Sequence, residues 1–315
     1  MERGMAQNVV QFQRGLSLDA FLASYGTEEQ CVAALLAMRF PQGYECGDCG
    51  RKEHKVERKG RMLECTHCYY RTYLTAGTIF QGTKLALRKW FLAMHLLTKD
   101  KQGISALQLM RELDVCYETA WTVKQKLMAV MEERSQGKKL ETSAVADDAY
   151  IGGKQSGKRG RGSENKVPFV AAASLTADGQ PDQIKLRVVA GFNKNSIKDW
   201  AQANLAQGLH LYTDGTPAFS AVKEAGIQHS ATSMRQDLTQ QDQGCFLWIN
   251  TLLGNLKTAL AGTYHSIEEK YFSRYLAEFE YRFNRRYDLK TILPRLLYAA
   301  IHTPPMPEDV LKLTA

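Results

Sequence analysis

Two closely spaced pairs of cysteines do most to limit what this chain can fold into. They are Cys46 with Cys49 and Cys65 with Cys68, and 15 residues separate the pairs. Two Cys-x-x-Cys pairs at this separation are typical of a zinc site, whereas the alternative is four unrelated thiols. Because four thiolates would fill the coordination shell, we predict one Zn²⁺ that stabilises structure and does no chemistry.

The composition is that of a soluble protein with several domains. The chain has 315 residues, 44% hydrophobic and 23% charged, which excludes wholesale disorder and a fibrous repeat. It has no apolar run of about 18 residues, and its first residues lack the apolar core of a signal peptide. We therefore expect a cytoplasmic protein without a membrane partner. The formal charge of +8 fits a polyanionic partner, or a solvated surface alone.

Changes in hydrophobic periodicity divide the chain into five segments and predict an α/β fold overall. The segments are an N-terminal helical segment (1–40), a zinc ribbon (41–76), a helix-turn-helix region (77–140), an α/β domain (141–290) and a helical tail (291–315). In the first segment, Thr27 opens a capping box for a helix that ends at Phe40. In the second, six Lys or Arg residues between the cysteine pairs favour nucleic acid, with a docking module as the alternative.

The region after the ribbon has the outline of a helix-turn-helix. Ser105 is placed to cap a short helix that ends near Leu113, and a longer helix is expected from Tyr117 to about Arg134. The same pattern fits a helical hairpin inside a larger core equally well, but the neighbouring basic ribbon favours DNA. The second helix would then offer four side chains to the duplex: Thr119, Thr122, Lys124 and Lys126.

The second half of the chain alternates strands with helices. Apolar segments bounded by Gly, Asp or Asn predict strands at 144–151, 167–175, 183–192 and 209–213. Helices are expected at 196–205 and 217–225, and over a longer region, 246–284, that is interrupted near Gly262. Three successive strands followed by this alternation predict a mixed sheet with helices on its faces.

Acidic residues occupy unusual positions in these strands. Asp147 and Asp148 interrupt an otherwise apolar strand, and Asp214 directly follows another. A carboxylate inside a buried strand is costly unless it is paired or binds a cation. Carboxylates brought together at one sheet edge would favour a hard divalent ion. For Asp214 and the glycine after it, a plain turn is the alternative.

A glycine-rich basic loop follows the first acidic strand. Between Gly152 and Lys166 it contains five Lys or Arg residues and one acid, Glu164. A flexible cationic loop beside a metal-binding strand suits a phosphodiester substrate, whereas a solvated linker is the alternative. The DNA-binding residues predicted here are Lys158, Arg159, Arg161 and Lys166.

Several stretches of sequence, in order along nearly the whole chain, resemble a single family. They are the zinc ribbon, Val145–Gly153, Gly160–Phe169, Tyr212–Gly215, Trp248–Lys257, Gly262–His265 and Arg274–Arg286. The chain resembles bacterial insertion-sequence transposases of the zinc-ribbon, DDE-related type. The resemblance implies an RNase H-like catalytic domain that cuts and rejoins DNA with divalent metal.

The resemblance also implies which residues act. Asp147 and Asp214 match the first two catalytic carboxylates, Asn250 stands at the third position, and Lys257 matches the basic residue that follows. These three oxygen ligands would hold two Mg²⁺ ions, with Mn²⁺ as a substitute, and Lys257 would offset charge on the scissile phosphate. Many relatives read Asp-Glu-Thr where this chain has Asp147-Asp148-Ala149, so the choice of Asp147 over Asp148 follows the alignment alone. If Asn250 plays no part, Glu278 and Glu280 are next in line.

The function implied is that of a DNA transposase. It would bind the terminal inverted repeats of its element and act on double-stranded DNA, both element ends and target, with no small-molecule substrate. Transposition needs two ends held together, so a homo-oligomer is expected. The alternatives are a DNA-binding regulator with an inactive catalytic domain and a stand-alone nuclease, but the retained acids favour activity.

Overall fold

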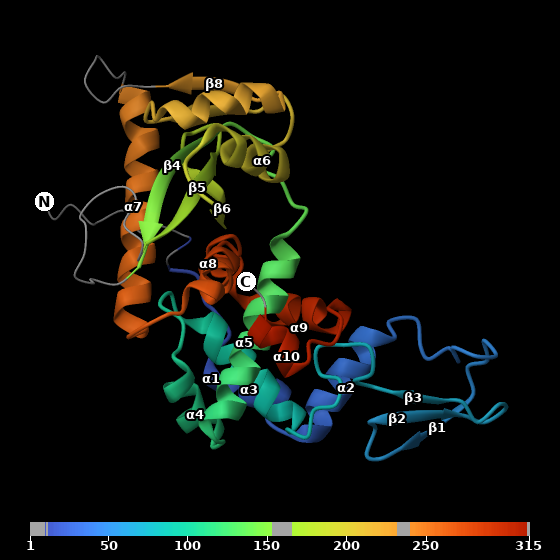
Figure 1. Ribbon diagram of the computed structural model, residues 1–315. Coiled ribbons are helices and arrows are strands. Elements are labelled where there is room, and N and C mark those ends of the chain that lie inside the picture. Colours follow the sequence, from blue (N-terminus) through green and yellow to red (C-terminus); the bar gives the residue numbers. More distant parts are fainter. Residues whose placement is uncertain (1–9, 11, 153–165, 232–239, 314–315) are drawn as a thin grey trace, which may run out of the picture. The chain divides into compact units, whose positions relative to one another are not determined.

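The computed structural model describes residues 10, 12–152, 166–231 and 240–313, with side chains of 240–245 and 313 left aside. The chain forms two compact units (Figure 1). Unit 1 combines Met1–Glu133 with Arg285–Leu313, and unit 2 comprises Arg134–Asn284. The sequence of unit 2 is therefore inserted into that of unit 1. Within the described ranges, no helix is long and apolar enough to cross a membrane.

Unit 1 begins with two helices that are capped as their sequences require. Helix α1 (Leu18–Tyr25) starts after Ser17, whose hydroxyl accepts a hydrogen bond from the amide of Ala20. Helix α2 (Glu28–Arg39) starts at a complete capping box between Thr27 and Gln30, which satisfies two otherwise unpaired amides. Both the box and the end of α2 before Phe40 were predicted and are confirmed.

The zinc ribbon is a three-stranded antiparallel sheet. Its strands are β1 (His54–Glu57), β2 (Met62–Cys65) and β3 (Arg71–Tyr73), in the order β1-β2-β3. All four residues of β1 are exposed, whereas β2 is mostly buried. Leu63 and Cys65 pack with Tyr44 against Leu36 and Phe40 at the end of α2, so the ribbon rests on that helix.

Three helices follow with the expected turn between the last two. They are α3 (Leu87–Lys99), α4 (Ala106–Leu113) and α5 (Tyr117–Ser135). The Ser105 hydroxyl caps α4, and Asp114 ends it in the left-handed conformation with φ 49°. The left-handed residue reverses the chain within three residues, so α5 begins where the sequence predicts.

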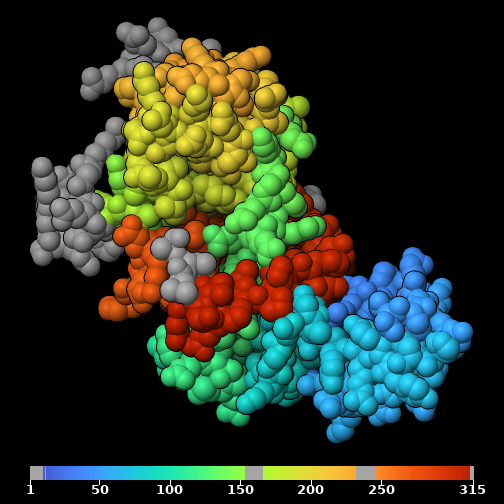
Figure 2. Space-filling view, turned by 45° about the vertical axis from the view of Figure 1, so that its right-hand side comes forward, coloured from blue at the N-terminus to red at the C-terminus, as the bar shows by residue number. Residues whose placement is uncertain are grey.

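The C-terminal residues complete unit 1. After the short helix η3 (Leu289–Thr291) come α9 (Ile292–His302) and α10 (Glu308–Leu313). Most side chains of α9 are buried, and the helix packs on α2 and α3, where the space-filling view shows red against teal (Figure 2). The amide of Ile79 donates to the carbonyl of Ala300, and the amide of Leu289 donates to the side chain of Gln13. The two ends of unit 1 therefore fold together.

Unit 2 is built on a five-stranded mixed sheet, as the RNase H-like resemblance implies. The strand order is β6-β5-β4-β7-β8, with β4–β5–β6 antiparallel and β4–β7–β8 parallel. The strands are β4 (Ala144–Ile151), β5 (Val167–Leu175), β6 (Pro181–Val188), β7 (His210–Thr213) and β8 (Gln228–Ala231). The prediction is confirmed for β4 and β5, and β6 lies some residues earlier than expected. The polar edge strand β8 was not predicted.

Helices cover both faces of this sheet. Helix α7 (Gln240–Thr263) and, after the short helix η2 (Glu269–Tyr271), helix α8 (Phe272–Phe283) bury one face. Helix α6 (Lys194–Asn204) and the 3₁₀ helix η1 (Pro217–Ala225) bury the other. Odd-numbered residues of β4, such as Val145 and Ala149, face α7, and even-numbered residues such as Ala146 face α6 and η1. Every side chain of β4 therefore has an assigned face.

The outer edge of β6 is covered by the side chains of α8. Glu280 accepts from the amide of Leu186 at 3.0 Å, and Asn284 both accepts from the amide and donates to the carbonyl of Ile184, at 2.7 and 3.0 Å. The side-chain amide of Asn284 thus takes the place of a neighbouring strand. This cover removes an open pairing edge from the sheet.

Candidate functional site

Two carboxylates meet where strand β7 ends beside its parallel neighbour β4. Strand β4 pairs with β7 so that Ala146 lies beside Thr213, and the next residues along the chain are Asp147 on β4 and Asp214 directly after β7. By the alternation of β4, Asp147 lies on the face that α7 covers. The register of two strands therefore brings together the first two residues of the implied catalytic set.

Asp148 joins the same cluster from the opposite face of β4. One carboxylate oxygen from each of Asp147, Asp148 and Asp214 lies within 4.8 Å of the others. The Oδ1 atom of Asp148 accepts a hydrogen bond from the hydroxyl of Thr216 at 3.0 Å. The amide of Thr216 in turn donates to Oδ1 of Asp214 at 3.1 Å. Sequence reasoning missed Thr216, although a threonine two residues after an aspartate in a turn is a signal that could have indicated it.

The electrostatics of the cluster fit a divalent cation. Burial and, after it, the negative charges of Asp214 and Asp148 raise the pKa of Asp147, Lys257 acts in the opposite direction, and the net result is a pKa of about 6. Three carboxylates this close repel one another unless a positive charge lies between them. Carboxylate oxygens are the ligands that Mg²⁺ and Mn²⁺ prefer, so these residues fit the metal that the family implies.

Helix α7 carries the other two residues of the implied set. Asn250 and Lys257 are seven residues apart and so lie on one side of the helix, next to the line of Ile249, Leu253 and Leu256 that packs on the sheet. Both side chains are exposed. The charge of Lys257 is near enough to lower the pKa of Asp147, which brings α7 and β4 into one site.

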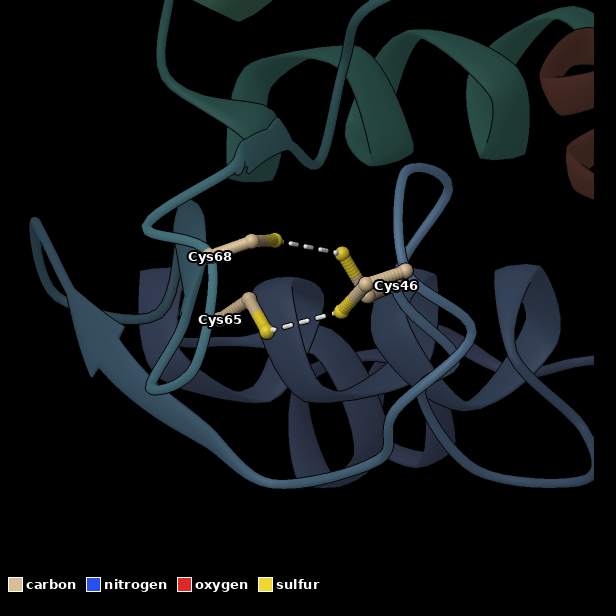
Figure 3. A group of neighbouring side chains, drawn as sticks. Cys46, Cys65 and Cys68 are labelled. Carbon is tan, nitrogen blue, oxygen red and sulfur yellow. Dashed lines mark hydrogen bonds between the residues drawn. The ribbon is translucent and has the colours of Figure 1, made fainter.

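The four predicted zinc ligands converge. The Sγ atoms of Cys46 and Cys68 are 3.5 Å apart, and those of Cys49 and Cys65 are 3.6 Å apart (Figure 3). All four sulfurs lie within 4.8 Å of one another. Zinc–sulfur bonds of about 2.3 Å in a tetrahedron would place the sulfurs about 3.8 Å apart, so the cluster fits one Zn²⁺.

Each cysteine pair forms a tight turn that favours a thiolate at its first cysteine. Gly50 and Tyr69, the residues that follow the two pairs, both adopt positive φ, 72° and 60°. Amides inside the turns then point at sulfur. Those of Cys49 and Asp48 lower the pKa of the Cys46 thiol to about 6, and those of Cys68 and His67 lower the pKa of Cys65. Burial and the neighbouring sulfurs raise the pKa values of the second cysteines, Cys49 and Cys68. Because metal-ligating cysteines bind as thiolates, the turns prepare the first ligand of each pair.

The helix-turn-helix residues differ in how far they can reach DNA. Thr119, Thr122 and Lys126 line a groove of about 700 Å³ between the start of α5 and residues 81–85. Lys124 is only 1% exposed, so the expectation that it lies close to phosphates is wrong. It belongs to the buried residues of α5, as in the alternative of a helical hairpin inside a larger core that the sequence alone left open.

The predicted basic loop lies mostly outside the described residues. Lys158, Arg159 and Arg161 belong to the range 153–165, about which the structure is silent. Lys166 is exposed immediately before β5. Because β5 pairs with β4 from Val167 opposite Ile151, both ends of the loop are fixed at the end of the strand that carries Asp147.

The two glutamates of α8 that were next in line as metal ligands are engaged elsewhere. Glu278 accepts from Arg282 at 2.6 Å and from the hydroxyl of Tyr264 at 3.0 Å. Glu280 pairs with Arg187 at 2.7 Å and with Lys185, and both glutamates are about 1% exposed. Both glutamates are therefore engaged in buried ion pairs within unit 2.

Comparisons with known proteins match both units. The model of a family described as the ISXO2-like transposase domain matches residues 139–284, and that of a transposase zinc-ribbon domain matches residues 26–71. A protein of Halobacterium salinarum, described as an uncharacterized protein in transposable element ISH50, is 26% identical over 224 residues, which cover 64% of this chain and 72% of that protein.

The matches agree with the geometry. The transposase-domain match spans the sheet, the acidic cluster and helices α7 and α8, and the ribbon match contains all four clustered cysteines. Together they cover more than half of the chain. The chain belongs to the insertion-sequence transposases that join a zinc ribbon to a DDE-type transposase domain.

Proposed function

We propose that the chain binds the terminal inverted repeats of an insertion sequence and catalyses metal-dependent cleavage and strand transfer of double-stranded DNA. The observation that carries the proposal is the placement of Asp147 beside Asp214, with Lys257 close enough to influence the pKa of Asp147. A site that served only to hold the fold together would have little reason to bury repelling carboxylates.

The charge of each residue in the site would determine its role in metal binding or in stabilising the phosphate. Asp147 and Asp214 would hold the divalent ions, and Asn250 would add a neutral carbonyl oxygen from α7. When bound, the ions would supply activation of the attacking oxygen and stabilisation of the leaving oxygen. Lys257 would offset charge that builds on the scissile phosphate, as a point charge without bidentate geometry.

DNA recognition would fall to the remaining elements. The ribbon, held by a structural Zn²⁺ on Cys46, Cys49, Cys65 and Cys68, and the start of α5 would contact the element ends. The basic loop, with Lys158, Arg159, Arg161 and Lys166, would contact the DNA backbone. Two ends must be held at once, so we propose a homo-oligomer, and a protein that acts on genomic DNA would work in the cytoplasm.

The test separates binding from chemistry. Asp147→Asn and Asp214→Asn should each abolish cleavage and strand transfer of a labelled element end in Mg²⁺ or Mn²⁺, because metal capture is lost. Binding of the same end, measured by gel shift without metal, should stay within about twofold of the unmodified protein. Asp178→Asn, a change at an exposed aspartate in the β5–β6 turn, is the matched control and should retain both.

Two outcomes would change the proposal. Full strand transfer in Asp147→Asn would reject the assignment of the metal site. End binding by the unmodified protein without cleavage in either metal would favour the second candidate, a DNA-binding regulator with an inactive catalytic domain. This second candidate is retained because Asn250, which stands at the third position of the implied catalytic set, is neutral.

A further inference from the structure

We propose that Thr216 and Asp148 are positioning residues that hold the carboxylate of Asp214 in place for metal binding. The inference rests on the proposed function of the same site. It concerns two side chains whose role does not follow from the family resemblance, since Thr216 is not part of the implied set and Asp148 is the residue that the alignment passes over.

The first observation is a bridge made by a single residue. Thr216 uses its backbone amide and its hydroxyl in two directions, donating to Oδ1 of Asp214 at 3.1 Å and to Oδ1 of Asp148 at 3.0 Å. All three residues are half-buried. Two carboxylates from different segments of the chain are therefore tied to one short turn.

The second observation is that Asp214 needs such support. Strand β7 ends at Thr213, and the last ladder partner of that strand on β4 is Ala146. Asp214 thus stands beyond the ladder, followed by Gly215 with φ +88°. Glycine leaves the backbone free to adopt many conformations, so the ladder alone does not fix the direction of the Asp214 carboxylate.

The third observation concerns the anchor. Thr216 precedes Pro217, the first residue of η1, and a residue before proline is restricted to extended backbone. Its ψ of 124° lies in the range that a following proline favours. Asp148 lies on β4, a central strand of the sheet. The hydroxyl bond therefore links the turn after β7 to a central strand of the sheet.

The arrangement also separates Asp148 from Asp147 in role. By the alternation of β4, Asp147 lies on the face covered by α7, where Lys257 influences it, whereas Asp148 lies on the other face, where Thr216 reaches it. Partners that orient metal-binding side chains typically change metal affinity 10- to 100-fold when they are removed. The bond to Thr216 needs an acceptor at position 148 and not a charge.

Metal binding by the full-length protein tests this without any DNA reaction. Free Mn²⁺ would be measured by electron paramagnetic resonance during titration of the metal-free protein. Thr216→Val, which keeps the shape and the amide but removes the hydroxyl, should weaken Mn²⁺ binding about 10-fold. Thr216→Ser should restore it. Thr176→Val is the matched control, because Thr176 also supports a turn of unit 2 through its hydroxyl, and it should leave the affinity unchanged.

Changes at position 148 distinguish an acceptor from a ligand. Asp148→Asn retains an oxygen that accepts from Thr216 and should keep Mn²⁺ affinity within about threefold, whereas Asp148→Ala should match Thr216→Val. The double variant Thr216→Val with Asp148→Ala should be no weaker than either single one, because both remove the same bond.

The outcomes separate this proposal from the proposed function. Equal loss in Asp148→Asn and Asp148→Ala, or unchanged affinity in Thr216→Val, would overturn the positioning role even if the protein transposes DNA. A 10-fold loss in Thr216→Val with rescue by serine would support it even if the unmodified protein cleaves no DNA.

Discussion

At the scale of single residues, Glu28 shows how one side chain can serve two helices. It lies in the first turn of α2, yet its carboxylate accepts from the amides of Leu87 and Arg88, both at 3.0 Å, at the start of α3. Helix α3 has no side-chain cap of its own. Burial acts to raise the pKa of Glu28, but the amides of Arg88 and Leu87 and the side chain of Arg61 outweigh it and lower the pKa.

We therefore predict a pH-dependent cost for Glu28→Gln. At pH 7 the change should lower the free energy of unfolding of unit 1 by about 1 kcal/mol, as loss of a charged cap does. A carboxylate with a lowered folded-state pKa stabilises above its unfolded pKa of about 4.3, and this is lost as pH falls through the folded value. Urea unfolding should thus show a smaller difference at pH 3 than at pH 7.

The control for this prediction is Glu29, the residue next to Glu28 in the chain. Glu29 is in the same first turn but is exposed, so Glu29→Gln experiences the same helix dipole without the two amides. An equal cost for both variants, or a cost for Glu28→Gln that does not change with pH, would contradict the capping role.

The choice between Asp147 and Asp148 as the first metal ligand shows how far a sequence can predict the role of a single residue. Alternation along a strand predicts that the two carboxylates lie on opposite faces. Which face carries a helix with Lys257 depends on packing between segments that are about a hundred residues apart. This packing is a property of the tertiary structure. The family resemblance could therefore favour Asp147 over Asp148 as the metal ligand, whereas the local sequence pattern could not.

At the scale of elements, α8 acts as a cover for the edge of β6. We predict that Asn284→Ala lowers the free energy of unfolding of unit 2 by about 1–3 kcal/mol, because it leaves both the amide and the carbonyl of Ile184 without their partner. Urea unfolding monitored by circular dichroism would measure this. Asn195→Ala, at an exposed position of α6, should cost nothing, and equal stability in both variants would refute the role of Asn284.

Elements with strong local signals were predicted, and elements fixed by distant contacts were not. The capping residues Thr27 and Ser105 and the apolar strands β4 and β5 lie where the sequence indicates. Strand β8 is short, polar and at an edge, so no apolar periodicity indicates it. Helix α5 has its predicted bounds, but its buried face includes Lys124, which a pattern of charges cannot reveal.

At the scale of the whole molecule, unit 1 is discontinuous and depends on α9. We predict that a chain ending at Asn284 loses the protease resistance of residues 12–133, while residues 134–284 stay resistant, because α9 belongs to unit 1 and packs on α2 and α3. Limited trypsin digestion followed by mass spectrometry would locate the cuts. A chain ending at Thr303 keeps α9 and should be cut far more slowly in residues 12–133. Equal digestion of the two chains would contradict the prediction.

The insertion of unit 2 into unit 1 has a consequence for the order in which a newly made chain matures. Residues 285–313 leave the ribosome only after all of unit 2 has been made. At about 5–20 residues per second, synthesis of the inserted unit takes roughly 8–30 seconds. During that interval unit 1 lacks the packing that α9 provides to α2 and α3. The unit that begins first in the sequence is therefore the last for which all residues have been made.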